Sequence, residues 1–185
     1  MKNNLYLRAF EYSDLNLLNL IRNDDILFQS TLGNKYYISS EYDKKWIEDK
    51  IFNNSNQLYL VICCKGIDEP IGYICVTNID YINRKAEWGG FVISREFISK
   101  GLGTDAGYLL LDHLFGELGM NMVYAYVKED NKASYRLSEK YGFKKDGLIR
   151  DFVFKQNRFH NAYIFSMLKS EYEELQLREQ ETSIS

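Results

Sequence analysis

The stretch that most constrains this chain runs from Ile93 to Ala106 and carries a Gly-x-Gly between two different residue periodicities. Before it lies an apolar, aromatic run typical of a strand, and after it leucines recur at helical spacing. Glycine at positions 101 and 103 permits positive φ and close approach of another molecule. The first amides of a helix are unpaired and lie at the positive end of its dipole. This arrangement predicts a phosphate site, although a lone Gly-x-Gly also fits an ordinary strand-to-helix turn.

Size and charge exclude several classes of protein. With 185 residues the chain is expected to form one domain, residues 1–185, whose charged end at 171–185 is a frayed helix. A formal net charge of −3 argues against a general nucleic-acid binder, which needs a basic face. No long apolar stretch suggests a signal peptide or membrane span, so we expect a cytoplasmic protein that binds no membrane. Cys63, Cys64 and Cys75 lie in apolar runs and are expected to be buried, reduced thiols.

Strand and helix patterns alternate along the chain. We expect strands at residues 5–10, 58–64, 71–78, 84–93, 123–127, 144–155 and 159–168. Helices are expected to be capped by Ser13, Ser40 and Asn131, and a further one follows the glycine loop. The segment 24–39 has weak periodicity and is expected to be a loop or broken helix that shapes a substrate pocket. The order predicts a mixed α+β domain, a central sheet with helices on its faces.

Three motifs occur in order in the second half of the chain. They are Ala86-Glu87 through Lys100-Gly101-Leu102-Gly103-Thr104, then Asn131-Lys132-Ala133-Ser134, then Glu139-Lys140-Tyr141-Gly142-Phe143. Together they resemble the GNAT (GCN5-related N-acetyltransferase) family, and within it the branch of ribosomal-protein N-terminal, spermidine and amino-sugar acetyltransferases. The resemblance implies an α+β (mixed α/β) fold: a central, mostly antiparallel twisted sheet of about six to seven strands, helices on both faces, and a middle strand pair that splays.

The resemblance also implies acetyl-CoA as the acetyl donor. The residues expected to bind it are Phe91, Val92, Ile93, Lys100, Gly101, Leu102, Gly103, Thr104 and Asn131. The loop amides would hold the pyrophosphate, and the free edge of the strand would pair with the amides of pantetheine. Asn131 fits a plain helix cap equally well.

The chain departs from the family pattern in two ways. Ile98 stands where relatives often have Gln or Arg, so Lys100 or Arg95 would have to supply charge near the phosphates. The spacing from Glu87 to Gly101 is about one residue longer than we expect for this branch, which a bulge at Gly89-Gly90 would accommodate.

The catalytic residues expected from the same resemblance are Glu87, Ser138 and Tyr135. Glu87 would take the proton of the attacking amine, directly or through water, unless it pairs with a neighbouring Arg84 or Lys85 on the surface. Ser138 stands where many relatives have a tyrosine that protonates the leaving thiolate. Tyr135 and Tyr141 are neighbours that could substitute, and Ser138 fits an ordinary helix residue as well. The histidines lack partners at a metal-binding spacing, so no metal is expected.

The acceptor is the least constrained part of the prediction. We expect direct attack by a primary amine in a ternary complex, with a peptide N-terminus or small-molecule amine as acceptor. Amino-sugar (nucleotide-sugar) and polyamine acceptors are alternatives that the same machinery would serve. A non-catalytic acyl-CoA sensor is the alternative from another class. A homodimer is compatible with the sequence and is not determined by it.

Overall fold

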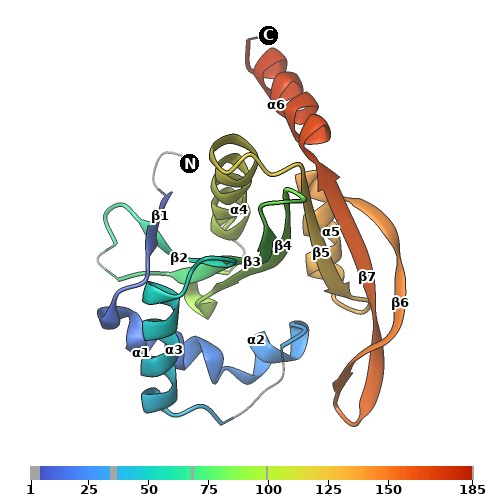
Figure 1. Ribbon diagram of the computed structural model, residues 1–185. Helices are drawn as coiled ribbons and strands as arrows, with labels where there is room; N and C mark the ends of the chain where they lie inside the picture. Colours follow the sequence, from blue (N-terminus) through green and yellow to red (C-terminus); the bar gives the residue numbers. More distant parts are fainter. Residues whose placement is uncertain (1–4, 34–36, 68, 99, 185) are drawn as a thin grey trace.

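The computed structural model describes residues 5–33, 37–67, 69–98 and 100–184, with Phe28 and residues 179–184 described in their backbone alone. Parts of our predictions at residues 1–4, 34–36, 68 and 99 lie outside the described residues. Seven strands form one sheet in the order β1-β2-β3-β4-β5-β7-β6 (Figure 1). Their bounds are Leu5–Ala9, Leu58–Cys64, Gly72–Asp80, Lys85–Ile93, Met122–Lys128, Lys144–Lys155 and Arg158–Leu168, from β1 to β7. All neighbouring strands are antiparallel except β4 and β5, which are parallel.

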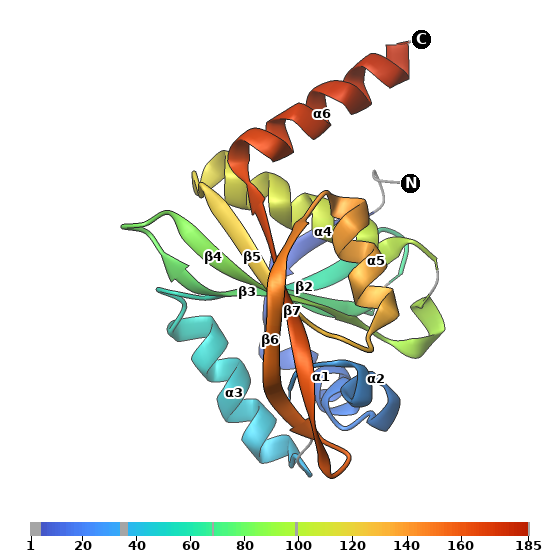
Figure 2. The same cartoon turned by 90° about the vertical axis from the view of Figure 1, so that its right-hand side faces the viewer.

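Helices cover both faces of this sheet. Their bounds are Leu15–Arg22, Asp25–Ser30, Ser40–Phe52, Leu102–Asp112, Lys132–Tyr141 and Lys169–Ile184, from α1 to α6. Figure 2 shows α4 and α5 on one side of the sheet and α1 to α3 on the other. The predicted mixed α/β fold is therefore confirmed. Within the described residues, no helix combines the length and apolar character that crossing a membrane requires.

The start of α1 differs from the prediction. Ser13 lies inside a 3₁₀ turn, Tyr12–Asp14, and does not cap α1. Asp14, whose position at the start of α1 would also suit the helix dipole, is 2% exposed and is held by two nitrogens of the Arg8 guanidinium at 2.7 and 2.8 Å. A bidentate, charge-assisted pair of this kind is stronger than a dipole contact, which explains why the carboxylate turns toward β1.

Two other helix ends also differ. Ser39, not Ser40, caps α3, and its side chain accepts a hydrogen bond from the Tyr42 amide at 3.2 Å. Either serine satisfies the cap chemistry, so sequence alone could not separate them. The charged tail, expected to be frayed, continues as helix α6 to Ile184. Its first turn is anchored by the buried ring of Tyr172, which stacks on Phe115 with centroids 5.0 Å apart.

The hydrophobic core has two parts. The larger part lies between the sheet and α4 and α5, and includes fully buried Ile74, Leu110 and Phe165. The smaller part lies under α1 and α3 and consists of Phe10, Leu18, Ile47, Val61 and Cys63. All three cysteines are free, as predicted, although Cys64 is only partly buried. Burial raises the pKa of Cys75 to about 12, so this thiol stays protonated and unreactive.

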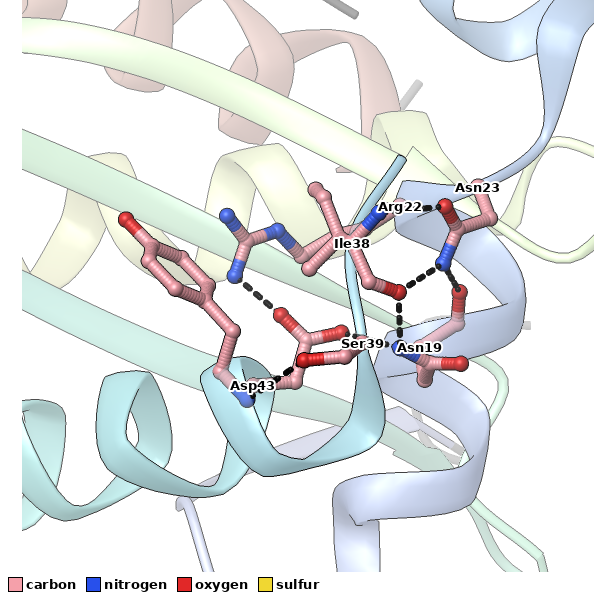
Figure 3. Close-up of polar contacts among 7 residues, drawn as sticks. Asn19, Arg22, Asn23, Ile38, Ser39 and Asp43 are labelled. Atoms are coloured by element: carbon pink, nitrogen blue, oxygen red, sulfur yellow. Dashed lines mark hydrogen bonds and ion pairs between the residues drawn. The ribbon is translucent and has the colours of Figure 1, made fainter. Parts of the chain in front are cut away.

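A buried polar network fixes the junction of α1 and α3 (Figure 3). The Asp43 carboxylate, fully buried on α3, accepts hydrogen bonds from Arg22 at 2.5 Å and from Asn19 at 2.7 Å, both on α1. The side chain of Asn23 donates to the carbonyl oxygen of Ile38 and accepts from its amide. Because the buried charge is paired and hydrogen-bonded, its desolvation is offset and the end of α1 is held in one position.

Candidate active site

The two central strands, β4 and β5, pair only at their beginnings. Parallel pairs join Lys85–Glu87 of β4 to Met122–Tyr124 of β5. Beyond Glu87 the described chain has no further pair between them, and Figure 1 shows the two ribbons diverging. We call this region the β4–β5 fork; it comprises Trp88–Ile93 of β4 and Ala125–Lys128 of β5. The predicted splay is therefore present, and it leaves the β5-facing edge of Phe91, Val92 and Ile93 without a strand partner.

A bulge lies at the base of the fork. Gly90 is opposite Cys75 of β3 and Trp88 is opposite Val76, so Gly89 is the extra residue. A side chain at Gly89 would place its Cβ 2.5 Å from the Cys75 sulfur, and Gly90 adopts φ of +79°. The bulge predicted from the two glycines is confirmed, and the register of β4 is now defined. Glu87 lies opposite Thr77 of β3 and Tyr124 of β5.

The glycine loop uses its two glycines for different reasons. Gly101 caps α4 at φ of +77°, and a Cβ there would meet nothing within 4 Å. Gly103 instead faces the protein: a Cβ would lie 2.2 Å from the Phe91 ring. We expected both glycines to admit another molecule; for Gly103 the structure shows a packing reason, because it lets α4 pack directly on β4, and its contact with a ligand stays a prediction. Only Gly101 leaves the backbone accessible, beside the unpaired first amides of α4, Leu102, Gly103 and Thr104.

Charge near this loop is distributed differently from the prediction. The Lys100 ammonium lies 5.0 Å from the centroid of the Phe97 ring, and the Lys100 side chain is exposed. Arg95, the other candidate, binds the Asp24 carboxylate through Nε at 2.5 Å and Nη2 at 2.7 Å. The guanidinium of Arg95 is therefore engaged by Asp24, and binding of an anion by Lys100 and the helix amides stays a prediction.

Tyr141 holds the first turn of α4 in place. Its buried hydroxyl lies 3.1 Å from the carbonyl oxygen of Gly103 and 3.2 Å from that of Thr104, and donates to this pair. Its ring packs edge-on against Tyr108 and Trp88, with centroids 5.1 and 5.8 Å away. Burial raises the pKa of Tyr141 above its ordinary value. The residue therefore anchors the loop, and its hydroxyl is already engaged at α4.

Glu87 lies on the sheet face opposite Tyr141. Successive strand residues point to opposite faces, and the neighbouring Trp88 ring packs on the rings of Tyr141 and Phe143. Glu87 Oε2 accepts a hydrogen bond from Asn78 Nδ2 at 2.8 Å, whereas Arg84 donates to the Gly119 carbonyl. The surface pairing considered for Glu87 is thus replaced by a contact within the sheet. Burial and the Glu87 carboxylate together raise the pKa of Tyr124 beside it.

The two catalytic candidates on α5, Ser138 and Tyr135, make contacts within the protein. Ser138 is buried, and its hydroxyl donates to the Ser134 carbonyl at 3.0 Å. The Tyr135 ring packs edge-on against Tyr163 and Phe165, with centroids 5.4 and 5.3 Å away. Their assignment to catalysis stays a prediction. To reach a leaving sulfur, the Ser138 hydroxyl would have to leave its helix carbonyl.

Asn131 uses both ends of its side-chain amide. Its Oδ1 accepts from the Ser134 amide at 3.0 Å, which makes it the predicted cap of α5. Its Nδ2 donates to the carbonyl oxygen of Ser30, at the end of α2, at 2.7 Å. The contact with α2 joins residues 101 positions apart in the chain, and no local pattern could have predicted it.

Sequence analysis also missed an aromatic row beside Glu87. Tyr124 and Tyr126, alternate residues of β5, have ring centroids 5.9 Å apart, and Tyr126 stacks on Phe152 of β6 at 4.9 Å. Phe152 reaches this position because β6 is irregular between Ile149 and Val153. The alternation of Tyr124 and Tyr126 was a usable signal in the sequence. No sequence signal marked Phe152, since its position depends on the irregular pairing of β6 with β7.

Comparison with known proteins identifies the family. A model of the acetyltransferase (GNAT) domain matches residues 4–144, which is more than half of the chain. The chain belongs to the GNAT acetyltransferase family. Family membership agrees with the splayed parallel pair and the glycine-capped helix described above.

Individual relatives add detail. An uncharacterised N-acetyltransferase of Bacillus licheniformis, p20, is 36% identical over 111 residues, 60% of this chain and 62% of that protein. Spermidine N(1)-acetyltransferase of Escherichia coli (strain K12) is 25% identical over 166 residues, 90% and 87% of the two chains. The crystal structure of spermidine N-acetyltransferase from Vibrio cholerae in complex with CoA and spermine superposes with a TM-score of 0.85 at 25% identity, covering 92% and 98%. The matched segment thus spans about three fifths of the p20 protein and most of the spermidine enzymes.

Proposed function

We propose that this GNAT protein is an acetyl-CoA-dependent N-acetyltransferase that acts by direct attack of a primary amine in a ternary complex. The observation that carries the proposal is the fork. Its unpaired strand edge lies between the glycine-capped start of α4 on one face and the Glu87 carboxylate on the other. A thioester held along that edge would meet an amine that approaches from the side of Glu87.

The residues at the helix start fit coenzyme A. The accessible backbone at Gly101 and the first amides of α4 suit a diphosphate, and Lys100 adds a mobile positive charge. The free edge at Phe91, Val92 and Ile93 offers backbone groups to the pantetheine amides, as a sheet edge does to an added strand. Coenzyme A would supply the acetyl group as an activated thioester.

Glu87 is the proposed base. An alkylamine with a pKa near ~10.4 is mostly protonated at neutral pH, and an ammonium group cannot attack a thioester. Glu87 can remove that proton directly or through a water, while Asn78 orients its carboxylate from β3. A β4 amide near Phe91 or Val92 would stabilise the developing oxyanion. Protonation of the leaving sulfur is assigned to Ser138, with Tyr135 as its neighbour.

The proposed acceptor is a peptide N-terminus or a small-molecule amine. The aromatic row of Tyr124, Tyr126 and Phe152 offers apolar contact area beside Glu87 rather than a cluster of acidic groups. Lys128, two residues beyond Tyr126 on β5, lies near Lys155 of β6; Asp130 offsets the charge of Lys128, and that of Lys155 disfavours a polycation. A polyamine is the second candidate, since relatives named spermidine acetyltransferases cover most of the chain.

A Glu87→Gln substitution tests the proposal. The acetyl-CoA-dependent rate is expected to fall by ~10²-fold or more, because glutamine is not a base, while the affinity for CoA measured by calorimetry stays unchanged. Glu174→Gln is the matched control, since Glu174 forms an exposed ion pair on α6 at 3.7 Å. An equal rate in Glu87→Gln would remove Glu87 as the base.

The acceptor is tested with a panel of amines and mass spectrometry of the products. A peptide with a free N-terminus, a simple monoamine, spermidine and glucosamine are compared at equal concentration with the full chain and acetyl-CoA. Acetylated peptide or small amine is expected in excess over acetylspermidine. Tight CoA binding with no product from any amine would favour the sensor instead, and no heat on CoA titration would refute both.

A further inference from the structure

Helix α2 joins the two arms of the fork. Asp24, immediately before α2, binds Arg95 in the 3₁₀ turn Arg95–Phe97 that follows β4. At the other end, the carbonyl oxygens of Gln29 and Ser30 accept hydrogen bonds from Lys128, the last residue of β5, and from Asn131. Figure 1 shows α2 lying below the point where β4 and β5 diverge. The helix therefore spans the fork from one strand end to the other.

The attachment at Asp24 is the more specific one. Two nitrogens of Arg95 bind the two carboxylate oxygens, at 2.5 and 2.7 Å, and Asp24 is only 15% exposed. The same carboxylate accepts from the amides of Ile26 and Leu27 at 2.9 and 3.0 Å, so it also caps α2. One side chain thus fixes the helix start and ties it to the segment after β4.

The attachment at the far end includes a buried ammonium group. The Lys128 ammonium, 7% exposed, donates to the Gln29 carbonyl at 3.1 Å and pairs with Asp130 at 3.1 Å. Asn131 donates to the Ser30 carbonyl while its oxygen caps α5. Behind Asp24, the network around Asp43 in Figure 3 holds the end of α1 rigid. Displacement of α2 therefore has to break contacts at identifiable atoms.

We propose that α2 is a strap that couples the two sides of the fork through the Asp24–Arg95 pair. The inference rests on the proposed function, because it takes CoA as the ligand of the glycine loop. Arg95 precedes Gly101 by only six residues, so a diphosphate bound at Gly101 also restricts Arg95. Restricting Arg95 stabilises the position that α2 has in this structure, over the side from which the amine approaches. Asp24 and Arg95 are thus positioning residues, which touch neither reactant.

Hydrogen exchange of the full chain, with and without CoA, tests this coupling. In the wild type, CoA is expected to slow amide exchange about fivefold or more at residues 24–33 as well as at 101–106, which is the size of ordinary coupling between sites. Asp24→Asn keeps the oxygen that caps α2 but weakens the ion pair. It should lose the CoA-dependent protection at 24–33 and keep that at 101–106. Arg95→Gln should behave alike, and the double variant should add nothing further. Glu174→Gln serves as the control with wild-type behaviour.

Each other result has a definite meaning. Protection of 101–106 without any protection of 24–33 in the wild type would refute the strap and leave the proposed function standing. Equal CoA-dependent protection of α2 in Asp24→Asn and the wild type would show that the coupling does not pass through this pair. Absence of protection at 101–106 would instead refute CoA binding by the loop, and the strap with it.

Discussion

The two sides of the β4–β5 fork are built by different means. The proposed cofactor side, around Gly101 and Tyr141, is made mainly of backbone: a left-handed glycine and helix amides, held by a tyrosine that donates to two carbonyl oxygens. The proposed acceptor side, around Glu87, Phe152 and α2, is made of side chains from segments far apart in sequence. The glycines that shape this backbone tolerate little substitution, whereas the side chains of the other surface can be exchanged for different residues. The difference indicates why one family can keep its donor while its acceptors vary.

The largest expected effect is at Gly103. A Gly103→Ala change would place a Cβ 2.2 Å from the Phe91 ring, so α4 must move away from β4. Overpacking of this kind costs ~1–3 kcal/mol, and we expect CoA affinity to fall roughly tenfold or more in calorimetry. Gly101→Ala is the informative comparison, because it meets no atom within 4 Å and strains only a left-handed backbone. If Gly101→Ala were the more damaging, the different reasons assigned to the two glycines would be reversed.

This contrast also explains what the sequence could predict. The bulge at Gly89, the cap at Gly101 and the end of α5 at Gly142 were predictable, because glycine's backbone freedom acts locally. The packing reason for Gly103 was not predictable, since it depends on the ring of Phe91, twelve residues earlier, which the fold brings against Gly103. The family motifs supplied Glu87, but its partner Asn78 lies on another strand.

The contacts of α2 were beyond sequence analysis altogether. Asp24 and Arg95 are 71 positions apart, and Gln29 and Lys128 are 99 apart. Each of these residues is an ordinary surface type by itself. A loop or broken helix over residues 24–39 was predicted from its weak periodicity, and the short helix α2 fits the second alternative, but what α2 binds is decided by tertiary structure.

Tyr141→Phe tests the proposed cofactor side and is expected to lower CoA affinity less than Gly103→Ala does. The change removes one buried hydroxyl and leaves the carbonyl oxygens of Gly103 and Thr104 without that donor, at a cost of ~1–3 kcal/mol in the free energy of unfolding. Urea unfolding should show this loss, and CoA affinity should weaken with it while the acceptor KM changes little. A variant with wild-type CoA affinity would mean that the first turn of α4 keeps its place without the hydroxyl.

Phe152→Ala probes the acceptor side. The ring stacks on Tyr126 at 4.9 Å but is 40% exposed, so its removal should cost the fold only ~0.5–1.5 kcal/mol. Steady-state kinetics should show a several-fold rise in the KM for the preferred amine, with CoA affinity at the wild-type value. Phe154→Ala is the matched control, since its exposed ring contacts Phe159 instead. Equal kinetics in the two variants would remove the aromatic row from the acceptor site.

The smallest expected effect is a pH dependence at Lys155. Burial and the nearby Lys128 lower the pKa of Lys155 to about 8, against 10.5 for an ordinary lysine. Between these two values the unfolded chain binds more protons at this position than the folded chain, so the free energy of unfolding rises with pH across the window. Lys155→Met should remove that rise in urea titrations at pH 7.5, 9 and 10.5.

Lys144 is expected to affect the pH dependence of the free energy of unfolding with the opposite sign, which Lys144→Met tests. Glu171 raises the pKa of Lys144, so the stability from this pair is present below the ordinary lysine pKa and is lost as pH increases beyond it. Removing Lys144 should therefore lower stability at neutral pH slightly, because the pair is exposed, and reduce the decline in strongly alkaline solution. If the free energy of unfolding rose with pH as steeply in Lys155→Met as in the wild type, Lys155 would be solvated like an ordinary surface lysine. The positive charge assigned to the acceptor side would then be too well screened to disfavour a polyamine.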